Sequence, residues 1–164
     1  TTVTRAADSL SFPFLPVPQA MTVYVKGVEQ GPWMADSVLF NIGTSSNPPA
    51  LYVIQQTPGY WNSAWNSGAS TVQSNSIAAA TSGDTVEVAT TLAADGKLQT
   101  LQSLNGGAAS GGSLSGALAL TATFGATPRL WIGSLYATLP TNFAFQRVAI
   151  AAGVRTMAEM RGMW

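Results

Sequence analysis

Apolar and polar residues alternate along most of this chain with a period of two, which is typical of β-strands that bury one face. The clearest alternation lies in segment 84–107, where every second residue from 86 to 92 shares one face. An Asp-Gly pair at 95–96 and an Asn-Gly-Gly run at 105–107 predict turns. We therefore predict an antiparallel hairpin, which needs a second sheet over its apolar face because a lone hairpin is marginally stable.

The same alternation predicts strands along the rest of the chain. They cover residues 9–14, 21–29, 37–43, 50–56, 60–66, one or two short stretches within 71–80, 116–123, 129–133 and 143–151. Within the second of these, Gly27 predicts a bulge or a close approach of another segment. The small-residue segment 108–115 is interpreted as a flexible loop. About ten strands at this spacing indicate an all-β, two-sheet antiparallel sandwich.

The C-terminal end departs from the strand pattern. Thr156 and Glu159 form a Thr-x-x-Glu capping box, which predicts one short helix within 156–163. We expect Met157, Met160 and Met163 to lie against the sandwich. The whole chain, 1–164, is predicted to be a single domain, with residues 1–7 as a linker or a first edge strand.

Composition excludes several classes of function. The seven Lys and Arg residues are scattered singly among seven acids, with a formal net charge of zero, which argues against nucleic-acid binding. No run of 18 apolar residues is present, so no membrane span is predicted. Charged residues make up 9% of the chain, against about a quarter in ordinary domains, and such surfaces tend to associate. We expect a chain that works inside a protein assembly.

Catalytic chemistry is not predicted. The sequence has no Cys and no His, so it lacks the commonest nucleophile, general base and metal ligands. Asp84 and Glu87 are interpreted as a solvated turn residue and a solvated strand residue rather than a catalytic pair. Asp36 is considered as a calcium ligand, but calcium needs clustered oxygen ligands and the acids here are isolated. We predict no enzyme activity, no metal and no cofactor.

The best candidate binding residues are Tyr60, Trp61, Asn62, Trp65 and Asn66. Flat aromatic rings beside amides are typical of sugar-binding surfaces. Two other interpretations remain open: large aromatic side chains often fill a core, and Trp and Tyr are enriched at subunit interfaces. We rank the core and the interface above the sugar site.

Several motifs together resemble the concanavalin-A-like, or laminin-G-like, jelly-roll domains of tailed-phage virion proteins. They are Thr4-Arg5-Ala6-Ala7-Asp8, the 21–29 strand, the 83–107 hairpin, Arg129-Leu-Trp-Ile-Gly133, Gln146-Arg-Val-Ala-Ile150 and Arg155-Thr-Met-Ala-Glu-Met160. The match spans nearly the whole chain, except that Ala151-Ala152-Gly153 stands where these domains usually carry a Tyr. The resemblance implies a jelly-roll fold and a non-enzymatic part of a virion.

The resemblance and the scarcity of charge lead to one preferred function and one alternative. We expect a phage virion structural protein, either a capsid decoration (cement) subunit or a head or tail fibre domain. It would act through contacts with itself, as a homotrimer, and with other virion proteins. The alternative is a lectin-like module that binds a host surface glycan through the aromatic cluster 60–66.

Overall fold

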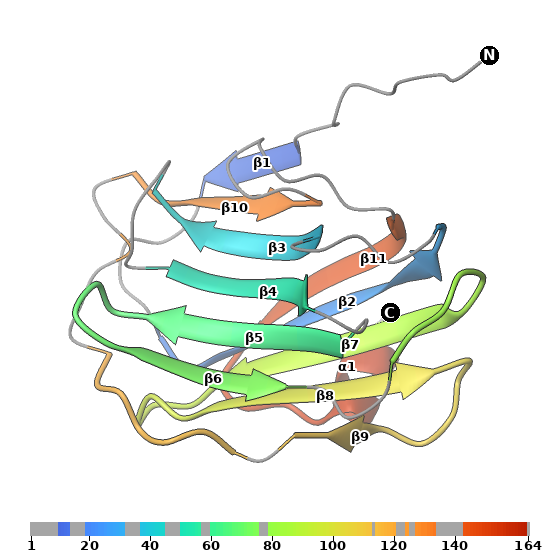
Figure 1. Cartoon of the computed structure of the whole chain (residues 1–164). Helices are drawn as coiled ribbons and strands as arrows, with labels where there is room; N and C mark the ends of the chain where they lie inside the picture. The colour runs from blue at the N-terminus through green and yellow to red at the C-terminus, as the bar shows by residue number, and fades with distance from the viewer. Residues whose placement is uncertain are drawn as a thin grey trace.

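Two antiparallel sheets pack face to face in the computed structural model, which describes residues 10–13, 19–31, 37–44, 50–56, 60–75, 79–112, 114–120, 124, 127–133 and 143–163 (Figure 1). Sheet A contains, in spatial order, β1 (Leu10–Pro13), β10 (Arg129–Ile132), β3 (Ser37–Gly43), β4 (Ala50–Gln56), β5 (Tyr60–Asn66) and β6 (Thr71–Asn75). Sheet B contains β11 (Phe143–Ala152), β2 (Met21–Glu29), β7 (Thr85–Leu92), β8 (Leu98–Leu104) and β9 (Ser110–Gly111). Helix α1 (Met157–Gly162) follows β11.

The core lies between the two sheets and is built by the alternation that the sequence shows. In β7, Val86, Val88 and Leu92 face inward and are buried, as the pattern predicts. Inward side chains from both sheets form one continuous apolar cluster. The predicted all-β, two-sheet arrangement with one short C-terminal helix is therefore confirmed.

Serine and threonine hydroxyls join the two sheets where β6 and β8 approach each other. Thr100 of β8 donates its main-chain N–H to Ser74 Oγ over 3.0 Å and its hydroxyl to the Ser74 carbonyl over 3.0 Å. Ser63 of β5 hydrogen-bonds the same Thr100 hydroxyl. Because these groups are buried, leaving any of them unpaired would destabilise the fold, so they fix how the sheets meet at this side.

Helix α1 covers the outer face of sheet B, behind β7 and β8 in the view of Figure 1. The predicted capping box is confirmed: Glu159 N donates to Thr156 Oγ1 over 3.2 Å, and Thr156 N donates to Glu159 Oε2 over 2.7 Å. Met157 and Met160 are buried against the sheet, whereas Met163 is about half exposed, so its predicted contact with the sandwich is only partial.

A buried carboxylate fastens this helix to the sheet. Glu87 on β7 accepts a hydrogen bond from Tyr24 Oη over 2.6 Å and from Arg161 Nε over 2.9 Å, and Lys26 Nζ lies 3.7 Å away. Arg161 also donates to Ser103 Oγ over 2.8 Å. Arg161 therefore ties the helix end directly to β7 and β8, and Glu87 extends this network to β2.

The interpretation of Glu87 as a solvated residue is wrong, because its side chain is buried beneath Arg161. Burial by itself would raise the pKa of Glu87. The hydrogen bonds from Arg161 and Tyr24, with the charges of Arg161 and Lys26, outweigh burial and lower the pKa of Glu87 below its usual range. An outward strand position predicts exposure only where nothing covers that face, and here α1 covers it.

A second acid, Glu29 at the end of β2, is buried, and among the described residues it pairs with no cation. Its carboxylate accepts one hydrogen bond, from Gln55 Nε2 over 3.3 Å, in the described part of the chain. Burial, with the neighbouring charge of Asp84, outweighs that bond and raises the pKa of Glu29. Ionised Glu29 therefore opposes folding, whereas ionised Glu87 favours it.

Three further predictions from the sequence can be compared with the structure. The 95–96 turn is confirmed, with Gly96 at a φ of +77°. A close approach at Gly27 is confirmed: a Cβ added there would lie 2.3 Å from the Ala144 carbonyl oxygen. The predicted 116–123 strand is wrong in its described part, 116–120, which bonds to the β7–β8 turn instead of joining a sheet.

The predicted 108–115 loop contains the short strand β9 (Ser110–Gly111), which pairs with β8, so this part of it is strand and not loop. Expectations for residues 1–7, Asp36 and residues 121–123 lie outside the described residues. No helix among the described residues has the length and apolar character needed to cross a membrane.

We expect Arg161→Ala to lower the free energy of unfolding by about 1–3 kcal/mol at pH 7, because it leaves buried Glu87 with fewer donors. The matched control is Arg155→Ala, whose half-exposed side chain pairs with Glu159 over 3.7 Å and should change stability by less than about 0.5 kcal/mol. Urea unfolding measures both. Because the pKa of Glu87 is lowered, the contribution of Arg161 should be full above the usual carboxyl range and vanish as the pH falls through that pKa. If Arg161→Ala and Arg155→Ala lower the free energy of unfolding equally, Arg161 does not stabilise the fold through buried Glu87.

Replacing Glu by Gln should change the free energy of unfolding in opposite directions at the two buried acids. Glu29→Gln removes a charge that folding disfavours, so it should raise the free energy of unfolding at pH 8 by about 1–2 kcal/mol. Since the pKa of Glu29 is raised, this gain should shrink as the pH drops and folded Glu29 becomes protonated. Glu87→Gln should destabilise the protein at pH 8. Urea unfolding at pH 8 and pH 4 measures both changes in stability. If Glu87→Gln stabilises the protein at pH 8, the conclusion that ionised Glu87 favours folding is refuted.

Candidate functional site

The predicted aromatic cluster lies on β5, and strand alternation divides it between two faces. Trp61 and Trp65 point into the core and are 0% exposed. The Trp61 ring packs edge-on against Phe143 with 6.0 Å between centroids, and the Trp65 ring packs against Phe124 at 5.5 Å. The core interpretation therefore describes these two indoles, and they are not surface contacts for a glycan or a partner.

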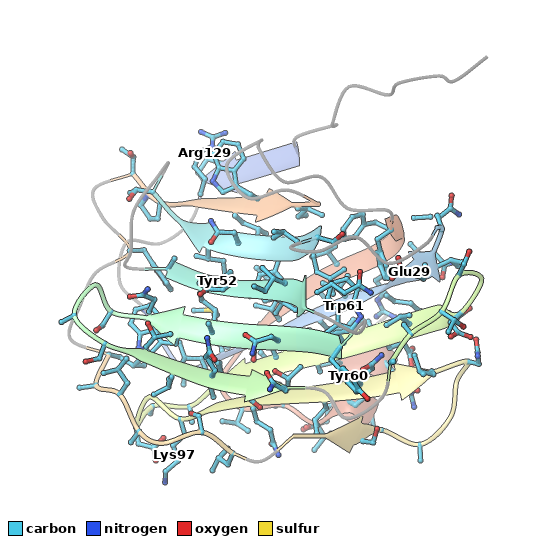
Figure 2. All side chains as sticks on the ribbon, viewed as in Figure 1. Glu29, Tyr52, Tyr60, Trp61, Lys97 and Arg129 are labelled. Carbon is cyan, nitrogen blue, oxygen red and sulfur yellow. The ribbon has the colours of Figure 1, made fainter. Side chains whose placement is uncertain are left out.

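The other three residues of the cluster lie on the outer face of sheet A. Asn62 is buried there and its amide donates to Asn75 Oδ1. Asn66 is half-buried and accepts from the N–H of Gly68 over 2.8 Å, so it helps to form the turn after β5. Tyr60 is half-buried at the start of the strand (Figure 2). Of the five candidates, only Tyr60 and Asn66 keep an accessible side chain.

The outer face of sheet A is nevertheless rich in aromatic and amide side chains. The six strands of this sheet contain a single charged residue, Arg129. In contrast to sheet B, no described helix covers this face, and it is turned toward the viewer in Figures 1 and 2. Among the described residues, this face therefore differs from the outer face of sheet B in lacking a covering helix and in carrying little charge.

Strand register places one row of side chains across this face. The Cα partners run Trp131, Asn41, Tyr52, Ala64 and Gln73, from β10 to β6. Trp131 and Tyr52 are half-buried, and Gln73 is exposed. Since neighbouring strands lie about 4.8 Å apart, the two aromatic residues are separated by roughly 10 Å, with Asn41 between them. The row offers two ring-bearing positions with an amide between them, followed by the small residue Ala64.

Asn41 is the unusual member of this row. Its neighbours in sequence, Phe40 and Ile42, belong to the core, so Asn41 points to the outer face. Its side chain is 0% exposed, yet neither its Oδ1 nor its Nδ2 has a hydrogen-bond partner in the described structure. A buried amide without partners costs about 1–3 kcal/mol, and the fold gains nothing visible in return.

The single charge of sheet A stands beside the row. The Arg129 guanidinium lies over the Trp131 ring at 5.8 Å from its centroid, in cation–π contact. Arg129 is exposed and lies at the β10 end of the face (Figure 2). The six strands of sheet A thus carry one positive charge, and it stacks on an aromatic ring of the row.

The described acids do not form a catalytic or metal-binding group. Asp84 accepts from Thr81 N and from Asn105 Nδ2, both over 2.8 Å, and Asp95 pairs with Lys97 over 2.8 Å. Each of these acids serves its own turn. Among the residues that the structure describes, no three acids come close enough together to hold a metal ion.

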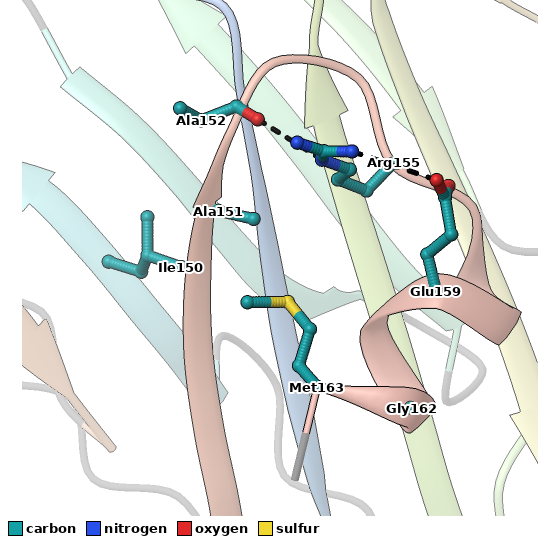
Figure 3. Close-up of a pocket in the computed structure, with 7 residues that line it drawn as sticks. All are labelled: Ile150, Ala151, Ala152, Arg155, Glu159, Gly162 and Met163. Carbon is teal, nitrogen blue, oxygen red and sulfur yellow. Dashed lines mark hydrogen bonds and ion pairs between the residues drawn. The ribbon is translucent and has the colours of Figure 1, made fainter.

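A shallow hollow lies on the opposite side of the molecule, between β11 and α1 (Figure 3). Its lining is Ile150, Ala151, Ala152, Arg155, Glu159, Gly162 and Met163. Arg155 and Glu159 pair with each other across its rim over 3.7 Å. The hollow holds small and apolar groups and a neutralised ion pair, and it brings together no reactive side chains.

Sequence reasoning missed Asn41, Tyr52 and Trp131. Alternation alone places each of them opposite core residues, so their outward direction was available from the sequence. Their alignment was not available, because β10 comes from a distant part of the chain and the register of β3 with β4 and with β10 cannot be read from alternation alone.

No protein-family model and no curated protein matches this sequence. Solved structures match it in shape at low sequence identity. The LG1–3 region of the laminin α2 chain is 12% identical with a TM-score of 0.67, covering 91% of this chain and 31% of that one. Tailspike protein 2 of Escherichia coli O157:H7 bacteriophage CAB120 is 14% identical with a TM-score of 0.62, covering 88% and 22%. This chain therefore spans less than a third of either protein.

A third similar structure is a smaller domain. The CBM40 of the Ruminococcus gnavus IT-sialidase, solved with α2,3 sialyllactose, is 13% identical with a TM-score of 0.60, covering 86% of this chain and 80% of that one. At such identities the likeness establishes shape alone. The chain folds as an all-β, two-sheet antiparallel jelly roll of the concanavalin-A-like kind, with one short C-terminal helix.

Proposed function

We propose that this chain is a non-enzymatic, lectin-like domain that binds carbohydrate through the outer face of sheet A. The observation that carries the proposal is Asn41, a buried amide without partners, held between Trp131 and Tyr52. A side chain kept at a loss of stability is more readily explained by a ligand than by packing.

The chemistry of the row suits a sugar. The rings of Trp131 and Tyr52 offer apolar faces for the C–H groups of a pyranose and carry their own polar atoms. Asn41 and Gln73 supply amide donors and acceptors that match hydroxyl groups. A surface with one charge in six strands requires little desolvation of ions when such a neutral ligand binds.

Asn41 is 0% exposed. A sugar therefore contacts Trp131 and Tyr52 first, and it reaches Asn41 when the groups that cover this amide move. Pairing the amide then recovers the free energy that its isolation costs, and this gain arises only in the complex. Such a gain makes binding selective for ligands that carry both a donor and an acceptor.

The spacing favours an extended oligosaccharide over a single sugar. Trp131 and Tyr52 lie two strands apart, roughly 10 Å, which is about the length of a disaccharide. The chain of sugars then lies across the strands, from β10 toward exposed Gln73 on β6. Arg129, at the β10 end, offers a contact for an acidic substituent.

The absence of an enzyme function is part of the same proposal. Four of the described acids have structural partners: Asp84 and Asp95 in turns, Glu87 in the helix clamp and Glu159 in the helix cap. The fifth, Glu29, is buried beside Gln55. None of them lies in the row on sheet A.

The likenesses agree with this proposal without identifying a ligand. The CBM40 with a similar fold was solved with a sialylated lactose, and another similar structure belongs to a phage tailspike. A glycan of a bacterial host surface is the ligand class that we propose for this chain.

A virion assembly role is the second candidate, and the charge-poor surface favours it. Here the chain is a capsid decoration subunit or a head or tail fibre domain, located in the virion, and sheet A contacts other virion proteins. The two functions are compatible, since a receptor-binding domain of a fibre does both. Mass spectrometry of purified phage particles from the source that encodes this chain tests the location, and its absence from intact particles would refute it.

A microarray of neutral and acidic oligosaccharides, including bacterial surface glycans, tests the carbohydrate proposal. Tyr52→Ala and Trp131→Ala should each weaken binding to the array ligand by about tenfold, because each removes a stacking contact worth about 1.4 kcal/mol. Leu114→Ala is the matched control, since Leu114 is exposed beside the β7–β8 hairpin and should leave binding unchanged.

The site itself is mapped by NMR with the same glycan. Backbone amide shifts should change along β10, β3 and β4. No binding on the array at millimolar glycan, or shift changes confined to sheet B, would refute the proposal. Thermal unfolding of each variant confirms that a lost signal reflects lost contact.

Asn41→Leu separates a ligand contact from a structural amide. The substitution keeps similar volume and removes the unpaired amide, so it should raise the free energy of unfolding by about 1 kcal/mol. Glycan binding should fall by about tenfold at the same time, because the sugar loses its donor and acceptor. Urea unfolding and titration calorimetry measure the two effects, and a destabilised variant with unchanged binding would show that Asn41 is structural.

A further inference from the structure

Strand β11 forms one edge of sheet B. It runs from Phe143 to Ala152 and, among the residues that the structure describes, pairs on one side only, with β2. A bulge at Gln146 divides it. The part after Arg147, residues 148–152, is apolar and without charge. Proteins usually protect such an edge with charges, prolines or cover, since it is a template for pairing with another strand.

The hydrogen bonds show which main-chain groups face this edge. Gly153 N donates to the Ala20 carbonyl over 2.7 Å, so this pair is a hydrogen-bonded pair of the β11–β2 ladder. Hydrogen-bonded pairs alternate along antiparallel strands. The N–H and C=O groups of Val148, Ile150 and Ala152 therefore point away from β2, toward the open edge.

A side-chain contact supports this direction independently. Arg155 Nε donates to the Ala152 carbonyl over 3.3 Å, which is possible only if that carbonyl points away from the ladder. The edge groups of Val148 and Ile150 have no partner among the described residues. Three consecutive edge positions thus offer donors and acceptors, and Arg155 alone satisfies one of them.

Exposed apolar side chains follow this edge in the chain, and one of them lies beside it. Val154 is 62% exposed and Met163 is 48% exposed, and they are two of the three large apolar side chains most exposed in the described structure. Met163 borders the hollow in which Ile150, Ala151 and Ala152 lie (Figure 3). A strand added at the edge would cover part of this surface.

We propose that two copies of this chain pair through β11, antiparallel, about a two-fold axis at Ile150. Ile150 then exchanges both hydrogen bonds with Ile150 of the second copy. Val148 exchanges both with Ala152 of the second copy, whose carbonyl then accepts from Val148 in place of Arg155, so every edge-directed group in 148–152 finds a partner. The two copies of sheet B become one continuous sheet.

The occupant is a second copy because the edge is self-complementary. Its three edge-directed residues are centred on Ile150, which is the arrangement that a two-fold axis requires. The facing side chains are Val148 with Ala152 and Ala149 with Ala151, all apolar, so no like charges meet. The chain carries no net charge, so two copies do not repel each other at long range.

Sedimentation equilibrium tests the pairing on the full chain between roughly 1 µM and 1 mM, since a short strand interface is expected to be weak. We expect a monomer–dimer equilibrium. Hydrogen exchange gives the residue-level signature: the amides of Val148, Ile150 and Ala152 should be protected more strongly as concentration rises. The amides of Ala149 and Ala151, already bonded to β2, should not change.

Two variants at one position separate pairing from folding. Ala152→Pro removes an edge-directed N–H that the β2 ladder does not use, so the fold should persist while dimerisation weakens by at least about tenfold. Ala152→Lys, which places a charge at the edge, should have the same effect. Ala158→Lys, on the exposed face of α1, is the control and should leave the dimer intact.

Three results would overturn the proposed β11 pairing: a monomer at all concentrations, a trimer, or a dimer unaffected by both Ala152 variants. If Ala152→Pro fails to fold, judged by circular dichroism, Ala152→Lys decides alone. Concentration-dependent protection at residues 148, 150 and 152, lost in Ala152→Lys, would establish it.

Discussion

Every strand of a sandwich has two faces, and only one of them can be buried between the sheets. The second face must be covered by something else or be suited to water or a ligand. In sheet B, helix α1 covers the second face. Arg161 at the end of this helix holds it there by bonding to buried Glu87 on β7. In sheet A no described helix does this, and the outer face carries aromatic and amide side chains with one charge. The difference between these two outer faces determines where the molecule is able to recognise anything.

Local signals in the sequence predicted the local structure well, because each depends on residues that are close in the chain. The hairpin of β7 and β8, its Asp-Gly turn and the Thr156–Glu159 capping box each need fewer than 25 residues of context. The sandwich itself followed from the number of alternating strands. The prediction failed at 116–120, where Leu118 and Leu120 alternate with small residues, but the main chain bonds to a turn instead of joining a sheet.

The candidate site could not be predicted in the same way, because it depends on register between distant strands. The sequence grouped Trp61 and Trp65 with Asn62 because they are neighbours in the chain, whereas alternation sends the two indoles into the core. Asn41 and Trp131 are 90 residues apart and face each other only through the β10–β3 pairing. Glu87 was misjudged for the same reason: the helix that covers it comes 70 residues later.

The two proposals concern different surfaces, and strand geometry relates them. Neighbouring antiparallel strands are related by a two-fold axis perpendicular to their sheet, so a pair formed through β11 keeps both sandwiches on the same side of the joined sheet. The outer faces of the two copies of sheet A then point in the same direction. A surface that displays many identical glycans would engage both faces at once, and the second contact would form at a high effective concentration. Two weak sites on the two copies of sheet A would in that way give a high overall affinity for a surface with many identical glycans, although each site alone binds weakly.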